Sequence, residues 1–430
     1  MSNEEKITDL IDALFNWIEK ENSSLLSYGK VNFRGALERF FYFSSVNRLE
    51  ALRPLLNAAR AWRDSTNDEL LAAYYDLCLA EIGEESLLSL CVKFLRKIAW
   101  LVKLRIAALR SSTLLMFHEN PPDSGVYPIA FFAFNNRFVY FFKEVVRGLG
   151  AENCVFISTN GLVAKDVVSG IGARLITPSR ITVEWSDVNI GVRHPLFFSY
   201  LMALFKYGMH YTALVKQRPS VLLFAEGTSM EDEIVALAAK NLGVPTVRLQ
   251  SGRAGILHSG YRQMCFDKML CWGHGFVERF KKYSPDPEYV ITGSPLMDHA
   301  RLGGSVSRAN SSHTISIFTQ PVSSYISEND YGQLVELAGE LIRKDVRINL
   351  VIRKHPADML DVFDALQDKF PLRIKMSNPE TQSLAEVLHS SVGAVGFFST
   401  TLSEATAYGV IPIILKLRDQ HSVFPYPEKH

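Results

Sequence analysis

Acidic side chains gather where one apolar run of the sequence ends. The run Val221–Phe224 leads into Ala-Glu-Gly-Thr-Ser-Met-Glu-Asp-Glu, a pattern that predicts a strand ending just before a helix. Acids in the first turn of a helix often serve only to cap it. Glu226 at the strand end and Asp232 in the following turn would also suit a nucleophile or a general base in sugar chemistry.

A cation and an imidazole follow the next apolar run. Arg253 and His258 come after the predicted strand Thr246–Leu249, on a glycine-containing loop. A guanidinium and an imidazole at a strand end can hold an anionic group of a substrate. Side chains of this kind on a loop are more often only solvated. Because both follow a strand end, the pair is nevertheless a candidate for the catalytic site beside Glu226 and Asp232.

Polar side chains also follow three apolar runs nearer the C-terminus. They are Thr319 and Gln320 after the first run, Lys354, His355 and Pro356 after the second, and Ser399, Thr400 and Glu404 after the third. The third group opens a predicted helix that Gly409 ends, and backbone N–H groups at a helix N-terminus favour a phosphate. Taken alone, this segment is an ordinary capped helix. Three such groups at one sheet edge predict a site for a phosphorylated ligand, with Glu404 in reach of a ribose.

Several other kinds of site are excluded by what the sequence lacks. It contains no Gly-Lys-Ser/Thr, and Gly170 and Gly172 do not complete a dinucleotide fingerprint. Its five cysteines form no CxxC pair and no zinc-like grouping with histidine, and there is no Asp-x-Asp pair. We therefore expect no metal and no cofactor other than the donor substrate.

Short apolar runs alternate with amphipathic segments, which predicts an α/β fold with parallel sheets covered on both faces. We expect a helical region at 1–110, a Rossmann-like unit at 111–301, a linker at 302–313 and a second Rossmann-like unit at 314–430. Ligands of such sheets bind at the strand ends, so the two units are expected to face a cleft. The predicted strands are Leu114–Phe117, Ile129–Ala133, Cys154–Ser158, Val221–Phe224, Thr246–Leu249, Met269–Trp272, Tyr289–Ile291, Thr314–Phe318, Asn349–Ile352, Leu372–Ile374, Gly393–Val395 and Ile411–Leu415.

Composition and charge limit which partners and which cellular compartment are expected. The chain has 430 residues and a net charge of +1, which gives no reason to expect nucleic acid. An odd cysteine count and the lack of a signal peptide favour the cytoplasm, and the apolar runs are too short to span a bilayer. Cations between Lys93 and Arg110 share one face of a predicted helix, which suits peripheral contact with a membrane. A surface helix packed on the first unit is the more ordinary interpretation.

The arrangement resembles the GT-B glycosyltransferases, with an acceptor-side unit followed by a nucleotide-sugar unit. Phe-Thr-Gln at 318–320, Lys-His-Pro at 354–356 and Ser-Thr-Thr-Leu-Ser-Glu-Ala at 399–405 are similar to elements of transferases that use CMP-activated acidic sugars. Over most of the chain it looks like the retaining β-Kdo (3-deoxy-D-manno-octulosonic acid) transferase modules of the WbbB type. The second unit stops soon after Leu415 without the long helix usual in such folds, which predicts a module of a larger protein.

This resemblance implies transfer of Kdo from CMP-Kdo to an acceptor glycan, free or lipid-linked, of a bacterial surface polysaccharide such as O-antigen or capsule. Asp232 would be the catalytic carboxylate. The CMP moiety would be held by His355, Ser399, Thr400 and Glu404, beside Thr319 and Gln320, with Lys354 and His355 stabilising the departing phosphate. Retention would require a glycosyl-enzyme on Asp232, whereas with inversion the same residue would act as general base, and the sequence leaves both open. Two alternatives are an epimerase of the UDP-N-acetylglucosamine 2-epimerase type and a non-catalytic glycan-binding module.

Overall fold

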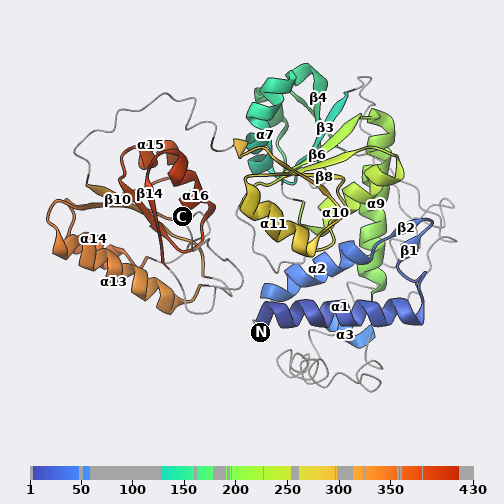
Figure 1. The fold of residues 1–430 in the computed structure, drawn as a ribbon, viewed down its shortest axis with the longest axis horizontal. Coiled ribbons are helices and arrows are strands. Elements are labelled where there is room, and N and C mark those ends of the chain that lie inside the picture. The colour runs from blue at the N-terminus through green and yellow to red at the C-terminus, as the bar shows by residue number, and fades with distance from the viewer. Residues whose placement is uncertain are drawn as a thin grey trace. The chain divides into compact units, whose positions relative to one another are not determined.

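The chain folds into two compact α/β units, each built around a parallel sheet (Figure 1). The computed structural model describes residues 3–47, 52–58, 127–158, 162–177, 190, 194, 196–225, 227–252, 261–295, 297, 313–322, 326–355, 358, 361–379 and 381–415. The main division between the units falls between Thr292 and Gly293.

Seven parallel strands form the sheet of the first unit, in the order β5-β4-β3-β6-β7-β8-β9. They are β3 (Ile129–Phe132), β4 (Cys154–Ile157), β5 (Arg174–Ile176), β6 (Val221–Phe224), β7 (Thr246–Leu249), β8 (Lys268–Cys271) and β9 (Glu288–Ile291). The first of these in sequence, β3, lies inside the sheet, and the chain winds outward from it in both directions. This is the doubly wound topology of Rossmann folds.

Helices connect these strands and bury apolar faces against the sheet. They are α7 (Asn136–Leu149), α8 (Lys165–Gly170), α9 (Phe197–Gln217), α10 (Met230–Asn241) and α11 (His274–Tyr283). Asn135 caps α7 by accepting a hydrogen bond from the Arg137 N–H at 3.0 Å. Phe142 of α7 then packs on Phe131 of β3, with ring centroids 4.7 Å apart. Local capping and apolar periodicity together place this helix on the sheet.

The N-terminal helices belong to the first unit. Helix α1 (Asn3–Glu21) packs on α2 (Arg34–Asn47), and α2 packs on α9 and α10. The strands β1 (Ser27–Tyr28) and β2 (Val31–Asn32) form a small antiparallel pair between them, and α3 (Arg53–Ala58) follows. The Tyr200 hydroxyl of α9 donates to the Ser27 carbonyl at 2.7 Å, which fixes this hairpin to the unit. The described part of the N-terminal region that was predicted as helical, within residues 3–58, is thus mainly helical, and residues 59–110 of the predicted region lie outside the described residues.

The sheet of the second unit has five parallel strands in the order β12-β11-β10-β13-β14. They are β10 (Thr314–Phe318), β11 (Asn349–Arg353), β12 (Ile374–Ser377), β13 (Gly393–Gly396) and β14 (Ile411–Ile414). Ser316 in the central strand β10 pairs with Val351 of β11 on one side and Ala394 of β13 on the other. The direction of winding therefore reverses between β10 and β13.

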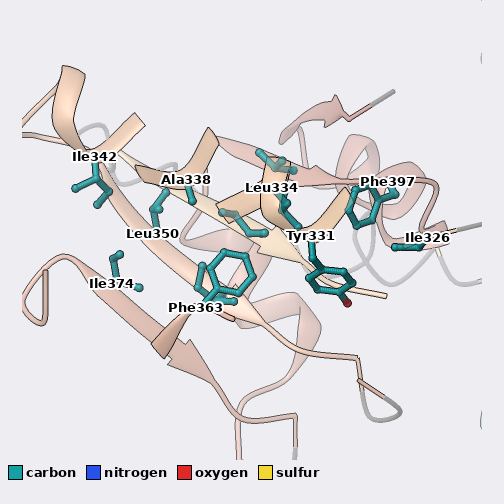
Figure 2. Packing of buried hydrophobic residues seen from close by; sticks show 12 residues of the cluster. Ile326, Tyr331, Leu334, Ala338, Ile342, Leu350, Phe363, Ile374 and Phe397 are labelled. Atoms are coloured by element: carbon teal, nitrogen blue, oxygen red, sulfur yellow. The ribbon is translucent and has the colours of Figure 1, made fainter. Parts of the chain in front are cut away.

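Two apolar cores flank this sheet. One is formed with α13 (Glu328–Lys344) and α14 (Asp364–Lys369), and Figure 2 shows Tyr331, Leu334, Ala338 and Ile342 of α13 lying over Leu350 and Ile374 of the strands. The other is formed with α15 (Leu384–His389) and α16 (Thr400–Ala407). Helices on both faces explain why β13 can be Gly-Ala-Val-Gly and buried along its whole length.

The predicted α/β fold class, with two Rossmann-like units each built on a parallel sheet, is confirmed. Most predicted strands are present with ends that match or differ by one residue, and β5 is an additional edge strand of three residues. Leu372 was expected to open a strand but is 90% exposed, and β12 begins at Ile374 instead. The predicted strand Leu114–Phe117, the basic segment Lys93–Arg110 and residues 302–312 of the predicted linker lie outside the described residues. Within the described part, no helix has the length and apolar character needed to cross a bilayer.

Candidate functional site

The carboxyl edge of the second unit's sheet brings the loops after β10, β11 and β13 to neighbouring positions. In open α/β sheets, ligands bind outside the strand ends where the winding reverses, which here is between β10 and β13. The residues predicted to bind a phosphorylated ligand lie on these loops or in the helix that follows: Thr319 and Gln320 after β10, Lys354 and His355 after β11, Ser399 after β13, and Thr400 and Glu404 in α16.

Thr319 connects the loops after β10 and β11. Its backbone N–H donates to the Arg353 carbonyl at 3.1 Å, and its hydroxyl oxygen accepts the His355 N–H at 3.1 Å. The residue is 4% exposed, whereas His355 is exposed. Thr319 was predicted as a ligand-binding residue, and in the structure its side chain fixes the backbone from which the His355 imidazole projects.

Gln320 connects the loops after β10 and β13. Its Oε1 accepts the Phe398 backbone N–H at 3.1 Å. Because a backbone N–H can only donate, this bond determines that the oxygen of the carboxamide faces Phe398 and that Nε2 faces away from it. No described residue accepts a hydrogen bond from Gln320 Nε2. The half-buried side chain is therefore oriented as a hydrogen-bond donor at the point where the winding reverses.

Cations at the end of β11 have different partners. Lys354 Nζ donates to Asp361 Oδ1 at 2.6 Å, in a pair whose aspartate is 71% exposed. The Arg353 guanidinium donates to the Ser377 hydroxyl at 3.0 Å and to the Gln382 carbonyl at 2.7 Å. Since a solvated ion pair is weak, Lys354 can exchange Asp361 for a ligand phosphate at low cost. Arg353 instead holds the loop after β12.

A buried tyrosine, which the sequence patterns did not single out, joins two of these loops. Tyr331 of α13 donates its hydroxyl to Asp358 Oδ2 at 2.8 Å, and the hydroxyl also contacts the Gln320 carbonyl. Burial, with the hydrogen bond and charge of Asp358, raises the pKa of Tyr331 far above its usual range, so the phenol stays protonated. Tyr331 lies 27 residues before Asp358, and periodicity cannot reveal so distant a contact.

The segment from β13 to α16 has the geometry that the sequence predicts. Ser399 is the N-cap of α16 and its Oγ accepts the Thr401 N–H at 3.3 Å. A Cβ built on Gly396 would lie 3.0 Å from the Phe318 carbonyl oxygen, so only glycine allows β13 to approach the end of β10 this closely. Gly409 has φ +69° just after the helix, which is the left-handed conformation expected of a helix-ending glycine.

Asp232, the predicted catalytic carboxylate, lies in the first turn of α10. Its Oδ2 accepts the Ser229 N–H at 2.9 Å and the Ser229 hydroxyl at 2.7 Å, while the Asp232 N–H donates to Ser229 Oγ at 3.1 Å. This is a capping box, the same arrangement found at the starts of α13 and α15. The side chain is 8% exposed. In the structure Asp232 therefore caps α10, and its role as a catalytic carboxylate stays a proposal.

Gly227, beside the predicted Glu226, is required for two reasons. It has φ +71°, and a Cβ there would lie 2.8 Å from Arg248 Cδ. Arg248 is fully buried on β7, with its guanidinium 4.3 Å from the centre of the Tyr261 ring. Four predicted site residues, Glu226, Arg253, His258 and Pro356, lie outside the described residues.

Within the described residues, no group of three or more His, Cys, Asp or Glu side chains could hold a metal ion. The three described cysteines, Cys154, Cys265 and Cys271, are free thiols. Burial raises the pKa of Cys154 and of Cys271 to about 11, which keeps both protonated at neutral pH.

Comparisons with known proteins extend to solved structures only, since no protein-family model and no curated protein matches the chain. MnaA of S. aureus, solved with UDP, is similar at 14% identity and a TM-score of 0.49, covering 69% of this chain and 80% of that chain. MurG of Acinetobacter baumannii is similar at 13% identity and a TM-score of 0.43, covering 69% of this chain and 80% of that chain. The lipopolysaccharide outer core galactosyltransferase WaaB is similar at 13% identity and a TM-score of 0.42, covering 69% of this chain and 83% of that chain. A function for this chain therefore has to be inferred from its own residues.

Proposed function

We propose that this chain is a glycosyltransferase whose nucleotide-sugar donor binds at the carboxyl edge of the second unit's sheet. The observation that carries the proposal is the Gln320 carboxamide, which Phe398 holds with Nε2 as a donor where the winding reverses. Lys354 and the capped first turn of α16 follow the adjacent strands. N–H donors and a cation at one strand edge suit the phosphate of a nucleotide.

The proposed donor is CMP-Kdo, and the acceptor is a sugar of a bacterial surface glycan. Its phosphate would be bound by Lys354, by Gln320 and by the start of α16, and Glu404 would accept hydrogen bonds from the ribose hydroxyls. CMP leaves as a phosphate, which needs little protonation, so cations and N–H donors are sufficient to stabilise the departing charge. No metal takes part in this scheme. The cytoplasmic side of a membrane, with at most peripheral contact, is the proposed location.

Asp232 is the proposed catalytic carboxylate. One of its oxygens attacks the anomeric carbon C2 of Kdo, the C2–O bond to CMP breaks, and the electron pair leaves on the phosphate. An acceptor hydroxyl then attacks C2, the bond to the carboxylate breaks, and the hydroxyl proton passes to a base. Two inversions give net retention. If Asp232 instead removes the acceptor proton, a single displacement gives inversion.

One experiment tests sugar, linkage and stereochemistry together. CMP-Kdo is incubated with candidate acceptor glycans, and the product is analysed by NMR. We expect a glycosidic Kdo signal that depends on the acceptor and on the enzyme. Release of free Kdo alone with every acceptor would contradict the transfer step.

Nucleotide binding separates the alternatives. At about a hundred times its Kd, a ligand of the folded state adds about 2.7 kcal/mol to the free energy of unfolding, so CMP is expected to raise the melting temperature. Stabilisation by UDP and not by CMP would favour an enzyme of the UDP-N-acetylglucosamine 2-epimerase type. Glycan binding without any stabilisation by CMP or UDP would favour a non-catalytic glycan-binding module.

A further inference from the structure

Three consecutive acidic side chains open α10, and all are buried. Glu231, Asp232 and Glu233, here called the α10 acidic turn, are 3%, 8% and 5% exposed. Carboxylates are rarely buried unless they are paired or hydrogen-bonded. In the α10 acidic turn, each carboxylate contacts a different part of the first unit.

Glu231 is held by α9. Lys206 Nζ contacts its Oε2, and His210 Nε2 lies 3.2 Å from its Oε1. Burial acts to raise the pKa of Glu231, but the hydrogen bond and charge of His210, followed by those of Lys206, lower it to about 2. The fully buried His210 ring packs edge-on against Phe132 at the end of β3, with centroids 5.3 Å apart. Glu231 is thus an ionised carboxylate fixed from two positions on one helix.

Glu233 is held by α2. Arg39 Nη2 lies 3.3 Å from Glu233 Oε2, and the two side chains are 3% and 6% exposed. Arg39 is itself oriented by the carbonyls of Gly35 at 3.0 Å and Arg262 at 3.1 Å. A Cβ on Gly35 would lie 3.0 Å from Glu233 Oε1, so α2 approaches this carboxylate as closely as glycine allows. The Cys265 thiol also contacts Glu233, and burial together with that charge holds its pKa well above the usual range.

Asp232 lies between these two anchored residues. Successive side chains on a helix are about 100° apart, so α9, α2 and the Ser229 cap hold the turn from different directions. A buried ion pair adds little stability over apolar side chains of the same volume. Charged hydrogen-bonded pairs do, however, accept a narrow range of geometries. Glu231 accepts such hydrogen bonds on one side of Asp232. On the other side, the Glu233 carboxylate lies beside an Arg39 guanidinium that two backbone carbonyls hold in place, which points to orientation as the role of both pairs.

We propose that Glu231 with Lys206 and His210, and Glu233 with Arg39, are positioning residues that fix the orientation of Asp232. The inference rests on the proposed function for the chemical role of Asp232. It makes the N-terminal helix α2 part of the catalytic apparatus of the first unit. Misplacing a reacting group by about 1 Å can cost about a hundredfold in rate, so loss of this orientation would be measurable.

The test replaces one buried pair by apolar side chains of similar volume, Arg39→Met with Glu233→Met. A matched control replaces the exposed pair of the same unit, Lys268→Met with Glu288→Met, whose side chains are 49% and 59% exposed. Thermal melting, hydrogen exchange of the backbone amides at 229–235, and kcat and KM for CMP-Kdo are measured for both. Hydrogen exchange reports the order of the turn whether or not the donor is turned over.

We expect the buried-pair variant to melt within a few degrees of wild type, to exchange the amides at 229–235 about tenfold faster, and to lose about 10- to 100-fold in kcat with donor KM unchanged. The control should match wild type in all of these. Wild-type exchange and wild-type kcat in a folded buried-pair variant would overturn the inference. If that variant does not fold, Arg39→Gln with Glu233→Gln removes both charges but keeps polar side chains at the two positions, and the same measurements of exchange and kcat decide.

Failure of the proposed function is distinguishable from failure of this inference. If wild type does not turn over CMP-Kdo, the proposed function fails. Faster exchange at 229–235 with an unchanged melting temperature would then still support the positioning role for this turn, and unchanged exchange would contradict it.

Discussion

At the scale of single residues, one backbone N–H determines which atom Gln320 presents to a ligand. Phe398 requires an acceptor, so the oxygen of the carboxamide is committed and Nε2 remains to donate. An acceptor on the ligand, either a phosphate oxygen or a base carbonyl, is the only kind of group that suits this atom. The polarity follows from the fold, because Phe398 lies 78 residues away in sequence.

Gln320→Glu keeps the acceptor for Phe398 and replaces the donor by an anionic oxygen. We expect CMP to bind at least about tenfold more weakly, because a donated hydrogen bond is lost and two negative charges are brought together. Calorimetric titration with CMP and with cytidine measures this. Weaker binding of CMP alone assigns the contact to the phosphate, and weaker binding of both assigns it to the base. Unchanged affinity for both ligands would show that Gln320 only connects the loops.

The capping role of Asp232 can be separated from its proposed catalytic role, because the chain contains a second aspartate that serves as a matched control for capping. Asp330 forms the same capping box with Ser327 at the start of α13. Asp232→Asn and Asp330→Asn should each lower the free energy of unfolding by about 0.3–1 kcal/mol, because the negative charge that favours a helix N-terminus is lost while an acceptor oxygen is kept. Only Asp232→Asn should also lower kcat, by a factor on the order of 10³ or more. Urea unfolding and CMP-Kdo turnover measure the two effects, and equal activity in both variants would leave Asp232 as a cap alone.

At the scale of elements, the sequence predicts strands better than it predicts contacts between loops. Inner strands of both sheets, such as Val221–Phe224 and Gly393–Gly396, are largely buried on both faces, so they stand out as short apolar runs. The edge strand β5 has only three residues, of which the first is an exposed arginine, and carries no such signal. At the candidate site, residue types and strand ends point to Thr319 and Gln320, but their bonds to His355 and Phe398 depend on strand order. Hydrophobic periodicity cannot supply that order.

Strand spacing at the candidate site depends on Gly396. Gly396→Ala places a Cβ 3.0 Å from the Phe318 carbonyl oxygen, so β13 has to move away from β10. We expect a loss of about 1–3 kcal/mol in the free energy of unfolding. Because Phe398 would move relative to Gln320, CMP should also bind more weakly.

The matched control for Gly396 is Gly332 in α13, where a Cβ would meet nothing within 4 Å. Gly332→Ala should raise the free energy of unfolding by up to about 1 kcal/mol, since alanine favours the helix, and should leave CMP binding as in wild type. Chemical unfolding and CMP titration of the two variants give the comparison. Equal stability of the two variants would show that the sheet adapts to the extra methyl group.

At the scale of the whole molecule, the buried pair of His210 and Glu231 makes stability depend on pH. Burial lowers the pKa of His210 below its usual 6.5, so the unfolded chain binds this proton more readily and the free energy of unfolding falls as the pH drops below about 6.5. A second fall is expected below about pH 4.5, the ordinary value for Glu231, whose folded pKa is about 2. His210→Gln keeps a donor for Glu231 and removes the titrating group, so the difference in unfolding free energy between pH 7.5 and pH 5.5 should shrink. Urea unfolding at the two pH values measures this, and an undiminished difference in the variant would assign the acid sensitivity to other groups.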